Sequence, residues 1–439
     1  MRLPQTPPPL LAPVRSAPAP TLPDGRYLHW DELRHRQPPD GLHPAEWWTE
    51  LRAARARQAQ PVEALSRCYG APFSLVPLPA LQRALHEFDR ANVGEQILAA
   101  LGTQEAKVEY RVRQLIEEAI SSSVLEGARP TTRELARQML REHREPTSRD
   151  ERMIVNNLRA MERIRELHAE GASLTLDHFL ELHRILGEDA LEVDGAAGVL
   201  RRPEHEVTVA DHEGNVWHTP PDARAIDERV AMLLRFANGA DEEASTFLHP
   251  IVRAILAHFW IGYEHPFRDG NGRMARALYY WCMLRAGYEV AEFLSISGPI
   301  DRAPRAYYLA FAYTETDEGD LTYFVLHQLG VMRTALDELL VHLKARSERL
   351  RMLAELIASF DSLNHRQRSL LEHALRHQSE GQSIEAHATS HRVHYMTARS
   401  DLAELERLGL MGSTRVRKVK RYYPSPRLLK AAGVSHKET

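Results

Sequence analysis

Cysteine is scarce in this sequence. Only Cys68 and Cys282 occur among the 439 residues, which argues against a disulfide framework and fits a reducing, cytoplasmic environment. The sequence has no Cys-x-x-Cys pair and no cluster of histidine with cysteine, so nothing in it suggests a zinc site.

Long apolar runs and a strong net charge are also absent. No stretch approaches the ~18 apolar residues of a transmembrane helix, and the proline-rich residues 1–25 hold too short an apolar run for a signal peptide. We therefore expect a cytoplasmic protein without membrane partners. The formal net charge of −4 argues against wholesale nucleic-acid binding, although it leaves a local basic patch open.

Helical periodicity dominates what is present. Apolar residues recur on one helical face in residues 105–126, 148–171 and 175–189. Residues 245–264 are apolar nearly all round, which predicts a central buried helix, and residues 272–288 form the next one. The sequence therefore predicts an all-α body.

One segment breaks the helical pattern. Residues 198–223 contain alternating polar and apolar residues at 206–209, a turn at Gly214-Asn215 and a stop at Pro220-Pro221. This pattern predicts a β-hairpin between helices. Such a hairpin is either packed down on the body or exposed for a partner chain to pair with.

The pattern of the chain predicts five parts. They are a disordered proline-rich leader (1–25), an N-terminal helical region (26–135), a core (136–330), a linker helix (331–360) and a small C-terminal domain (361–432). The linker region carries a heptad of leucines, which indicates either a dimer seam or a helix packed on its own domain. The heptad leucines are Leu329, Leu336, Leu343 and Leu350.

The small C-terminal domain reads as three helices followed by a basic hairpin, which is the plan of a winged helix. Residues 397–408 resemble a recognition helix, with Arg392, His394 and Arg399 near its start. The hairpin would contact phosphates of DNA, although winged helices also dock proteins, and both partners stay open. Its basic residues are Arg415, Arg417, Lys418, Lys420 and Arg421.

The stretch "EHPFRDGNGRMAR", residues 264–276, concentrates the residue types that handle phosphates. Gly270 and Gly272 let backbone N–H groups approach an anion at a helix N-terminus, and Asn271 can donate to a phosphate oxygen. Arg273 and Arg276 are three residues apart and project from one helix face, which suits the terminal phosphates of a nucleotide.

The other polar residues of this stretch supply chemistry. Asp269 is a hard oxygen ligand for Mg²⁺, and His265 can take a proton from a hydroxyl nucleophile. Phe267 is expected to anchor the loop in the core. A turn between helices needs the glycines but not the other polar residues, so the stretch indicates nucleotidyl or phosphoryl transfer.

These residues resemble a known family. "HPFRDGNGRMAR" matches the Fic signature H-P-F-x-[DE]-G-N-G-R-x-x-R at every fixed position. The resemblance implies a Fic-type helical bundle with a hairpin flap, in the subgroup with an N-terminal inhibitory helix and a C-terminal winged helix. It implies AMPylation, the transfer of AMP from ATP to a Ser, Thr or Tyr hydroxyl of a protein.

The resemblance also implies a role for each residue of the motif. His265 is then the general base, and Asp269 holds Mg²⁺ on the α- and β-phosphates. Arg273 neutralises the β-phosphate side, and Arg276 reaches the γ-phosphate. The α- and β-phosphates lie in a cradle formed by Gly270, Asn271 and Gly272.

A second match lies upstream, in "SSSVLEG", residues 121–127. Ser122, Glu126 and Gly127 fit the family's inhibitory motif [ST]-x-x-x-[EQ]-[GN]. The resemblance implies that Glu126 pairs with Arg276 and so blocks the site of the γ-phosphate. The alternative interpretation is an ordinary helix end that Gly127 caps.

The remaining predictions concern partners and rivals. Val207, Thr208 and Val209 of the hairpin would pair with an extended target segment. Tyr307 and Tyr308 would stack near adenine or pack in the core. Rival functions are removal of AMP from a modified target by the same site, and DNA-binding regulation through the winged helix.

Overall fold

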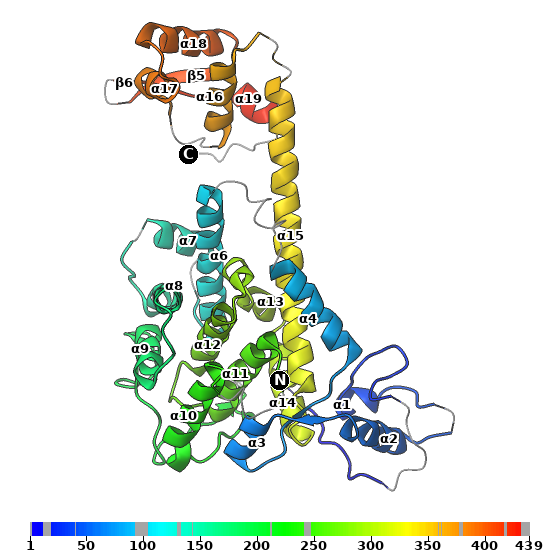
Figure 1. Cartoon of the computed structure of the whole chain (residues 1–439). Helices are drawn as coiled ribbons and strands as arrows, with labels where there is room; N and C mark the ends of the chain where they lie inside the picture. The colour runs from blue at the N-terminus through cyan, green and yellow to red at the C-terminus, as the bar shows by residue number, and fades with distance from the viewer. Residues whose placement is uncertain are drawn as a thin grey trace. The chain divides into compact units, whose positions relative to one another are not determined.

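The computed structural model places helices over most of the chain, with short strand pairs between them (Figure 1). The mostly helical fold predicted from the sequence is confirmed. The structure describes residues 2–11, 19–39, 41–92, 104–129, 133–142, 144–210, 213–240, 247–358, 360, 362–376, 381–416 and 419–431. Among these residues no helix is both long and apolar enough to cross a lipid bilayer.

The described residues fall into two compact units, one ending at Leu339 and the other beginning at Leu340. The N-terminal part of the first unit holds α1 (Trp30–Leu33), α2 (Pro44–Ala56), β1 (Gln60–Pro61), α3 (Glu63–Tyr69), β2 (Ser74–Leu75) and α4 (Pro79–Asn92). Then follow α6 (Gln104–Leu125), α7 (Arg133–Arg141), α8 (Arg149–Ala169) and α9 (Leu176–Gly187). After a hairpin come η1 (Ala223–Ala225), α10 (Ile226–Ala237), α11 (Pro250–Glu264), α12 (Asn271–Arg285), η3 (Glu289–Phe293), α13 (Ser297–Arg302), α14 (Pro304–Thr316) and the start of α15 (Thr322–Ala358).

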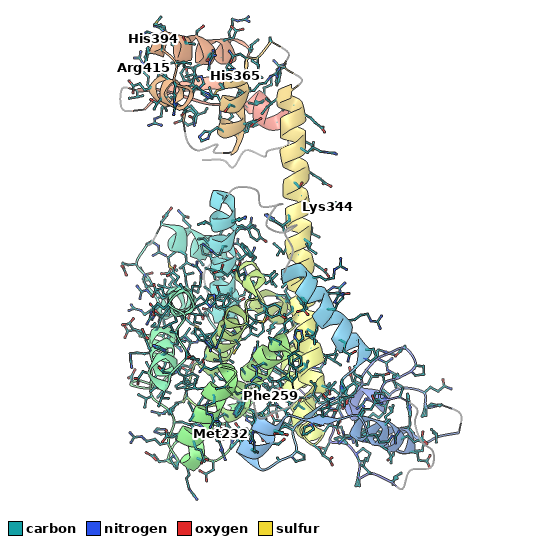
Figure 2. The ribbon with its side chains drawn as sticks, viewed as in Figure 1. Met232, Phe259, Lys344, His365, His394 and Arg415 are labelled. Atoms are coloured by element: carbon teal, nitrogen blue, oxygen red, sulfur yellow. The ribbon has the colours of Figure 1, made fainter. Side chains whose placement is uncertain are left out.

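Helices α11 and α12 form the centre of the first unit (Figure 1). Helix α11 begins at Pro250 because the Nδ1 of His249 accepts the N–H of Ile251, and proline suits the first helical position. Its side chains are buried on every face, as the all-round apolar sequence predicts. Phe259, labelled in Figure 2, is fully buried against Phe73 and Phe311.

The N-terminal residues differ from expectation. The end of the leader is packed, since Leu22 is buried in a cluster with Trp47 and Trp48 of α2, whereas most of residues 2–11 are exposed. Arg55 donates to the carbonyl oxygen of Pro20 at 3.0 Å. The apolar side chain and the backbone acceptor near the end of the leader give it tertiary contacts that its proline content does not reveal.

The predicted hairpin is present. Strand β3 (Val209–Ala210) pairs antiparallel with β4 (Val216–His218), and Gly214 adopts φ 80° in the connection. Residues 211 and 212 lie outside the described residues. The register places Val209 opposite His218, at the base of the hairpin.

The second unit contains the rest of α15, α16 (His365–Arg376), α17 (Ile384–His391), α18 (Tyr395–Arg407), β5 (Met411–Val416), β6 (Val419–Pro424) and α19 (Pro426–Ala431). Strands β5 and β6 form an antiparallel hairpin in register from Met411↔Pro424 to Val416↔Val419. A bridge between Gln382 and Tyr422 adds a third short segment beside them. Three helices and a hairpin therefore follow the predicted order, and Arg417 and Lys418 lie outside the described residues.

The heptad leucines lie on α15, which is one unbroken helix across the boundary between the units. Leu329 and Leu336 are buried in the first unit, as are Met332 and Leu339 at the other seam position. Their burial favours a helix packed on its own domain over a dimer seam. The side chain of Leu350 is outside the described residues.

Candidate active site

His265 lies where α11 ends, in the left-handed conformation with φ 51° and ψ 57°. Its Nδ1 is 3.3 Å from the carbonyl oxygen of Gly262, so in the neutral ring Nδ1 carries the proton and Nε2 is the free acceptor. Burial lowers the pKa of His265 to about 4. The ring is therefore neutral near pH 7 and can accept a proton.

The loop after His265 is fixed by Phe267 and Asn271. The side chain of Asn271 accepts the N–H of Phe267 and donates to its carbonyl oxygen, both at 2.9 Å. Phe267 is fully buried and its ring stacks on His183, with ring centroids 3.5 Å apart. The anchoring role expected of Phe267 is confirmed, and the side-chain amide of Asn271 donates one hydrogen bond to this loop.

Asp269 is oriented by backbone donors. Its Oδ1 accepts the N–H of Gly270 at 2.6 Å, and its Oδ2 accepts the N–H of Glu192 at 2.8 Å. Its carbonyl oxygen is 2.9 Å from the Nε2 of His183. The carboxylate is thus held at the loop beside the start of α12. Among the described residues, no group of three or more His, Cys, Asp or Glu side chains is arranged to hold a metal ion.

The start of α12 is a turn that brings backbone N–H groups to one point. Gly270 is its N-cap with φ 81°, a conformation that favours glycine. The first turn of a helix exposes N–H groups without intrahelical acceptors, and the helix dipole favours an anion there. Gly272 lies in this turn, so the geometry is that of an anion site.

Arg273 is buried behind this turn. One of its terminal nitrogens donates to the carbonyl oxygen of Leu186 at 2.8 Å, and the other is 3.9 Å from Asp269 Oδ1. Its Nε has no hydrogen-bond partner among the described residues. Burial of the guanidinium lowers the pKa of Arg273. A phosphate oxygen would provide the acceptor that this buried cation lacks.

Arg276 is also buried and is engaged by the 121–127 segment. Its Nε donates to the Oγ of Ser122 at 2.7 Å, and its Nη2 donates to the carbonyl oxygen of Ser122 at 2.9 Å. The same Nη2 forms an ion pair with Glu126 Oε1 at 3.0 Å. The Nε and Nη2 donors of Arg276 are therefore directed at two residues 150 or more positions upstream.

Glu126 reaches this position because α6 ends at Leu125. Gly127 adopts φ 93°, and the N–H of Ala128 returns to the carbonyl oxygen of Ser123 at 3.0 Å, which closes the helix end. The carboxylate of Glu126 lies so close to Gly272 that a Cβ added to Gly272 would overlap it. Glu126 thus occupies the anion site at the start of α12.

His265, Gly272 and Glu126 line one cavity of about 140 Å³, together with Tyr307 and Tyr308 of α14. Arg273 and Arg276 do not line it, but line a separate cavity beside Ser122. The hairpin contributes Val209, Trp217 and His218, and α14 further contributes Phe311, Ala312 and Glu315. The cavity therefore joins the histidine, the helix N-terminus and an aromatic wall.

The hairpin residues differ in exposure. Val209 lines the cavity, whereas Thr208 is exposed and Val207 is half-buried outside the cavity lining. His218 of β4 ties the hairpin to the body, since its Nδ1 is 2.7 Å from Glu315 Oε2 and its Nε2 is 2.7 Å from the carbonyl oxygen of Tyr263. The base of the hairpin is therefore fixed beside the cavity.

Several site residues were not found by the sequence reasoning. Trp217, His218 and Glu315 carry no local motif, and their place at the cavity follows only from the tertiary fold. His258 is fully buried, with its Nε2 2.8 Å from the Tyr307 hydroxyl. Arg201 was also missed, although it donates hydrogen bonds to the loop at His265.

Comparison with known proteins agrees with this geometry. The Fic/DOC family model matches residues 173–283, which include His265 and both arginines. The chain carries a Fic domain. The 121–127 segment lies outside the matched range.

Relatives of the Fic domain are similar at modest identity. Proteins named "Protein adenylyltransferase Fic" from Drosophila grimshawi and Nematostella vectensis are 33% identical over 168 residues and 28% identical over 176 residues. Each match covers 38% of this chain. It covers 30% of the Drosophila protein and 38% of the Nematostella protein, so this chain spans about a third of their length.

A solved structure supports the fold over a longer stretch. The crystal structure of a Fic family protein from Desulfovibrio desulfuricans G20 aligns with a TM-score of 0.53 at 20% identity. The alignment covers 79% of this chain and 95% of that one. The Fic fold thus extends beyond the 111 or so residues of the family match.

Proposed function

We propose that this protein transfers AMP from ATP to a Ser, Thr or Tyr hydroxyl of a target protein. The observation that carries the proposal is a single cavity shared by His265 and the N-terminal turn of α12. A proton acceptor and an anion site on one cavity suit attack of a hydroxyl on a bound phosphate. The names of the relatives support the same reaction.

The proposed step needs only ATP, the target hydroxyl and His265 to account for the bonds formed and broken. The Nε2 of His265 takes the proton of the target hydroxyl, whose oxygen attacks the α-phosphorus of ATP. The bond from the α-phosphorus to its bridging oxygen breaks, and pyrophosphate leaves. The neutral state of His265 supports its assignment as the base, because a protonated imidazole could not accept this proton.

We assign phosphate binding to the backbone N–H groups at Gly270, Asn271 and Gly272 and to the two arginines. Asn271 contributes through its backbone and through the loop shape that its side chain holds. Arg273 would supply its unpartnered Nε, and Arg276 would turn its fork to the γ-phosphate. The buried arginines would neutralise charge in a site shielded from water.

Asp269 is the residue we assign to Mg²⁺. Each of its carboxylate oxygens accepts one backbone N–H, which orients the group and leaves a further lone pair on each oxygen. Mg²⁺ usually binds through one or two carboxylates together with substrate phosphates, so one carboxylate beside an anion site fits this ion. The ion would neutralise charge on the phosphates when bound.

We also propose that Glu126 inhibits the enzyme. Its carboxylate lies in the anion site and takes the Nη2 of Arg276, so a triphosphate would meet a negative charge and an occupied guanidinium. Ser122 adds two acceptors to the same guanidinium. Release of this segment would free both the site and the arginine.

The hairpin is the surface we assign to the target protein. Val209 lines the cavity, and the exposed residues beside it could pair backbone to backbone with an extended segment of the target. Such pairing would place a hydroxyl near His265 with little demand on target sequence. Val207, Thr208 and Val209 are the residues involved.

The test uses a released enzyme and two labels. Glu126→Gly protein with α-labelled ATP and Mg²⁺ in a host lysate should label a target band, whereas γ-labelled ATP should not. Glu126→Gly combined with His265→Ala is the matched control and should label nothing. A band only with γ-labelled ATP would show a kinase, and no band with either label would contradict nucleotide transfer.

The second unit supports a separate, second function. Arg392, His394 and Arg399 are exposed near the start of α18, and Arg415 is exposed on β5; Figure 2 labels His394 and Arg415. We propose that this face binds duplex DNA, with α18 in the major groove and the β5–β6 hairpin on phosphates.

Anisotropy of labelled duplex DNA tests this second function. Affinity should fall steeply between 50 and 200 mM salt and should drop in Arg399→Ala with Arg415→Ala. Arg407→Ala, at the other end of α18 and paired with Glu404, is the control. Equal loss in the control, or binding without salt dependence, would contradict the proposal.

A further inference from the structure

Arg201 satisfies three consecutive carbonyl oxygens around His265. Its Nε donates to the carbonyl oxygen of His265 at 2.8 Å, and its Nη2 donates to that of Glu264 at 3.0 Å. Its backbone N–H donates to the carbonyl oxygen of Pro266 at 2.9 Å. One residue, 64 positions upstream of His265, therefore fixes the backbone before, at and after the histidine.

The backbone at His265 needs such a restraint. His265 is a residue other than glycine in the strained left-handed region, and such a conformation persists only where its surroundings hold it. The turn directs the imidazole to the cavity and leaves the carbonyl groups of the last residues of α11 without intrahelical donors. The buried side chain of Arg201 supplies such a donor to Glu264, the last residue of α11, and another to His265 itself.

The same guanidinium also reaches the hairpin. The Nη2 of Arg201 donates to the carbonyl oxygen of Pro221 at 2.5 Å, three residues after β4 ends at His218. Leu200 forms a β-bridge with Phe267 on the other side of the loop. Arg201 thus connects the end of the hairpin segment with the loop that carries His265.

The buried charge of Arg201 is compensated. Glu264, which is fully buried, has its Oε1 3.6 Å from Arg201 Nη2 and 3.6 Å from Arg229 Nη1. Its Oε2 accepts the hydroxyl proton of Tyr69 of α3 at 2.6 Å. The guanidinium therefore has a fixed counter-ion and a fixed set of acceptors, so that its fork has one orientation.

We propose that Arg201 is a positioning residue for AMP transfer, which holds His265 in its turn and couples it to the hairpin. This inference rests on the function proposed above. Arg201 does not line the cavity, so it acts on the proton acceptor and not on ATP. Its loss should therefore lower kcat and leave ATP binding in place.

The experiment uses the full chain with Glu126→Gly as the active parent. Arg201→Met removes the donors and the charge at similar volume, and Arg201→Lys keeps the charge but replaces the fork by one ammonium group. Arg202→Met is the matched control, because Arg202 is the adjacent, exposed arginine. For each variant we would measure kcat, the KM for ATP, the Kd for ATP and the pH dependence of kcat.

We expect Arg201→Met to lower kcat at least a hundredfold and Arg201→Lys about tenfold, with the Kd for ATP changed less than twofold. The acid limb of the kcat profile should move to higher pH in Arg201→Lys, since a loosened His265 gains water. A purely structural role would lower thermal stability and ATP affinity together and would not move this limb. Arg202→Met should match the parent.

Other results would overturn the proposal. They are kcat of Arg201→Lys within twofold of the parent, or a Kd for ATP that rises as much as kcat falls. The Lys variant decides the matter if Arg201→Met fails to fold. An inactive Glu126→Gly parent would count against the proposed AMP transfer instead, so the two failures are distinguishable.

Discussion

The loop at His265 and the carboxylate of Glu126 meet at the start of α12 but are held very differently. The loop is fixed by backbone bonds from Asn271 and Arg201 and by the buried ring of Phe267. The carboxylate of Glu126 is 26% exposed, and among the residues that the structure describes it forms an ion pair with Arg276 alone. The difference indicates a rigid chemical site beside a carboxylate that can leave it.

The largest change in rate should come from a substitution in the rigid loop, at His265. His265→Ala in the Glu126→Gly background removes the only group that we assign to proton transfer, and we expect the rate of AMP transfer to fall about 10²–10⁴-fold. The measurement is initial-rate labelling with α-labelled ATP. ATP affinity should stay the same, because the phosphate site is separate. A rate within tenfold of the parent would contradict the assignment of the base.

The next largest change in rate should come from a substitution of Glu126. Glu126→Gly removes the carboxylate from the anion site, and we expect the rate to rise at least tenfold over the wild type. Glu126→Gln is the matched variant, because it keeps the shape and removes the charge. Its rate should lie between the two. If the wild type and Glu126→Gly transfer AMP equally fast, Glu126 is not inhibitory.

A smaller effect should follow from the partner of Glu126. Ser122→Ala removes the acceptor of Arg276 Nε and leaves the carbonyl acceptor in place. Loss of one neutral acceptor should weaken the hold of this segment on the Arg276 guanidinium by roughly 1 kcal/mol. We therefore expect a two- to fivefold gain in rate. Ser121→Ala is the control, since the Ser121 hydroxyl accepts from Arg133 instead. Equal gains in rate in the two variants would show that Ser122 has no specific part in the inhibition.

The pH dependence should show the smallest change. The pKa of His265 is lowered to about 4 by burial, so the base form is already complete at pH 6 and is lost only as pH falls through that pKa. We expect the kcat of Glu126→Gly to vary less than twofold from pH 6 to 8. A rate that halves near pH 6.5 would show a histidine with an ordinary pKa.

The sequence predicted the parts of this comparison that depend on local pattern. Helix α11, the β3–β4 hairpin and the buried Phe267 followed from periodicity and turn residues. Arg201 could not be found in this way, because its acceptors are backbone oxygens 20 and 63 to 65 positions away, and any sequence offers those. Every residue has a backbone carbonyl oxygen, so the residue types do not show which of these oxygens accepts a hydrogen bond.

Asn271 shows a second limit of sequence reasoning. An amide next to glycines suits a phosphate as a donor, yet its side chain pairs with the backbone of Phe267 four residues earlier. A phosphate donor and a brace for the loop would both be an asparagine at position 271, so the residue type does not distinguish these two roles. The packed ending of the leader at Leu22 was missed for a similar reason, since proline-rich composition does not record tertiary contacts.

The most direct test of the account is the affinity for ATP with Mg²⁺, measured by calorimetry on the wild type and on Glu126→Gly. If Glu126 and the triphosphate compete for Arg276 and the anion site, the Kd for ATP should be at least tenfold lower in Glu126→Gly, which corresponds to about 1.4 kcal/mol. Equal dissociation constants would contradict the competition.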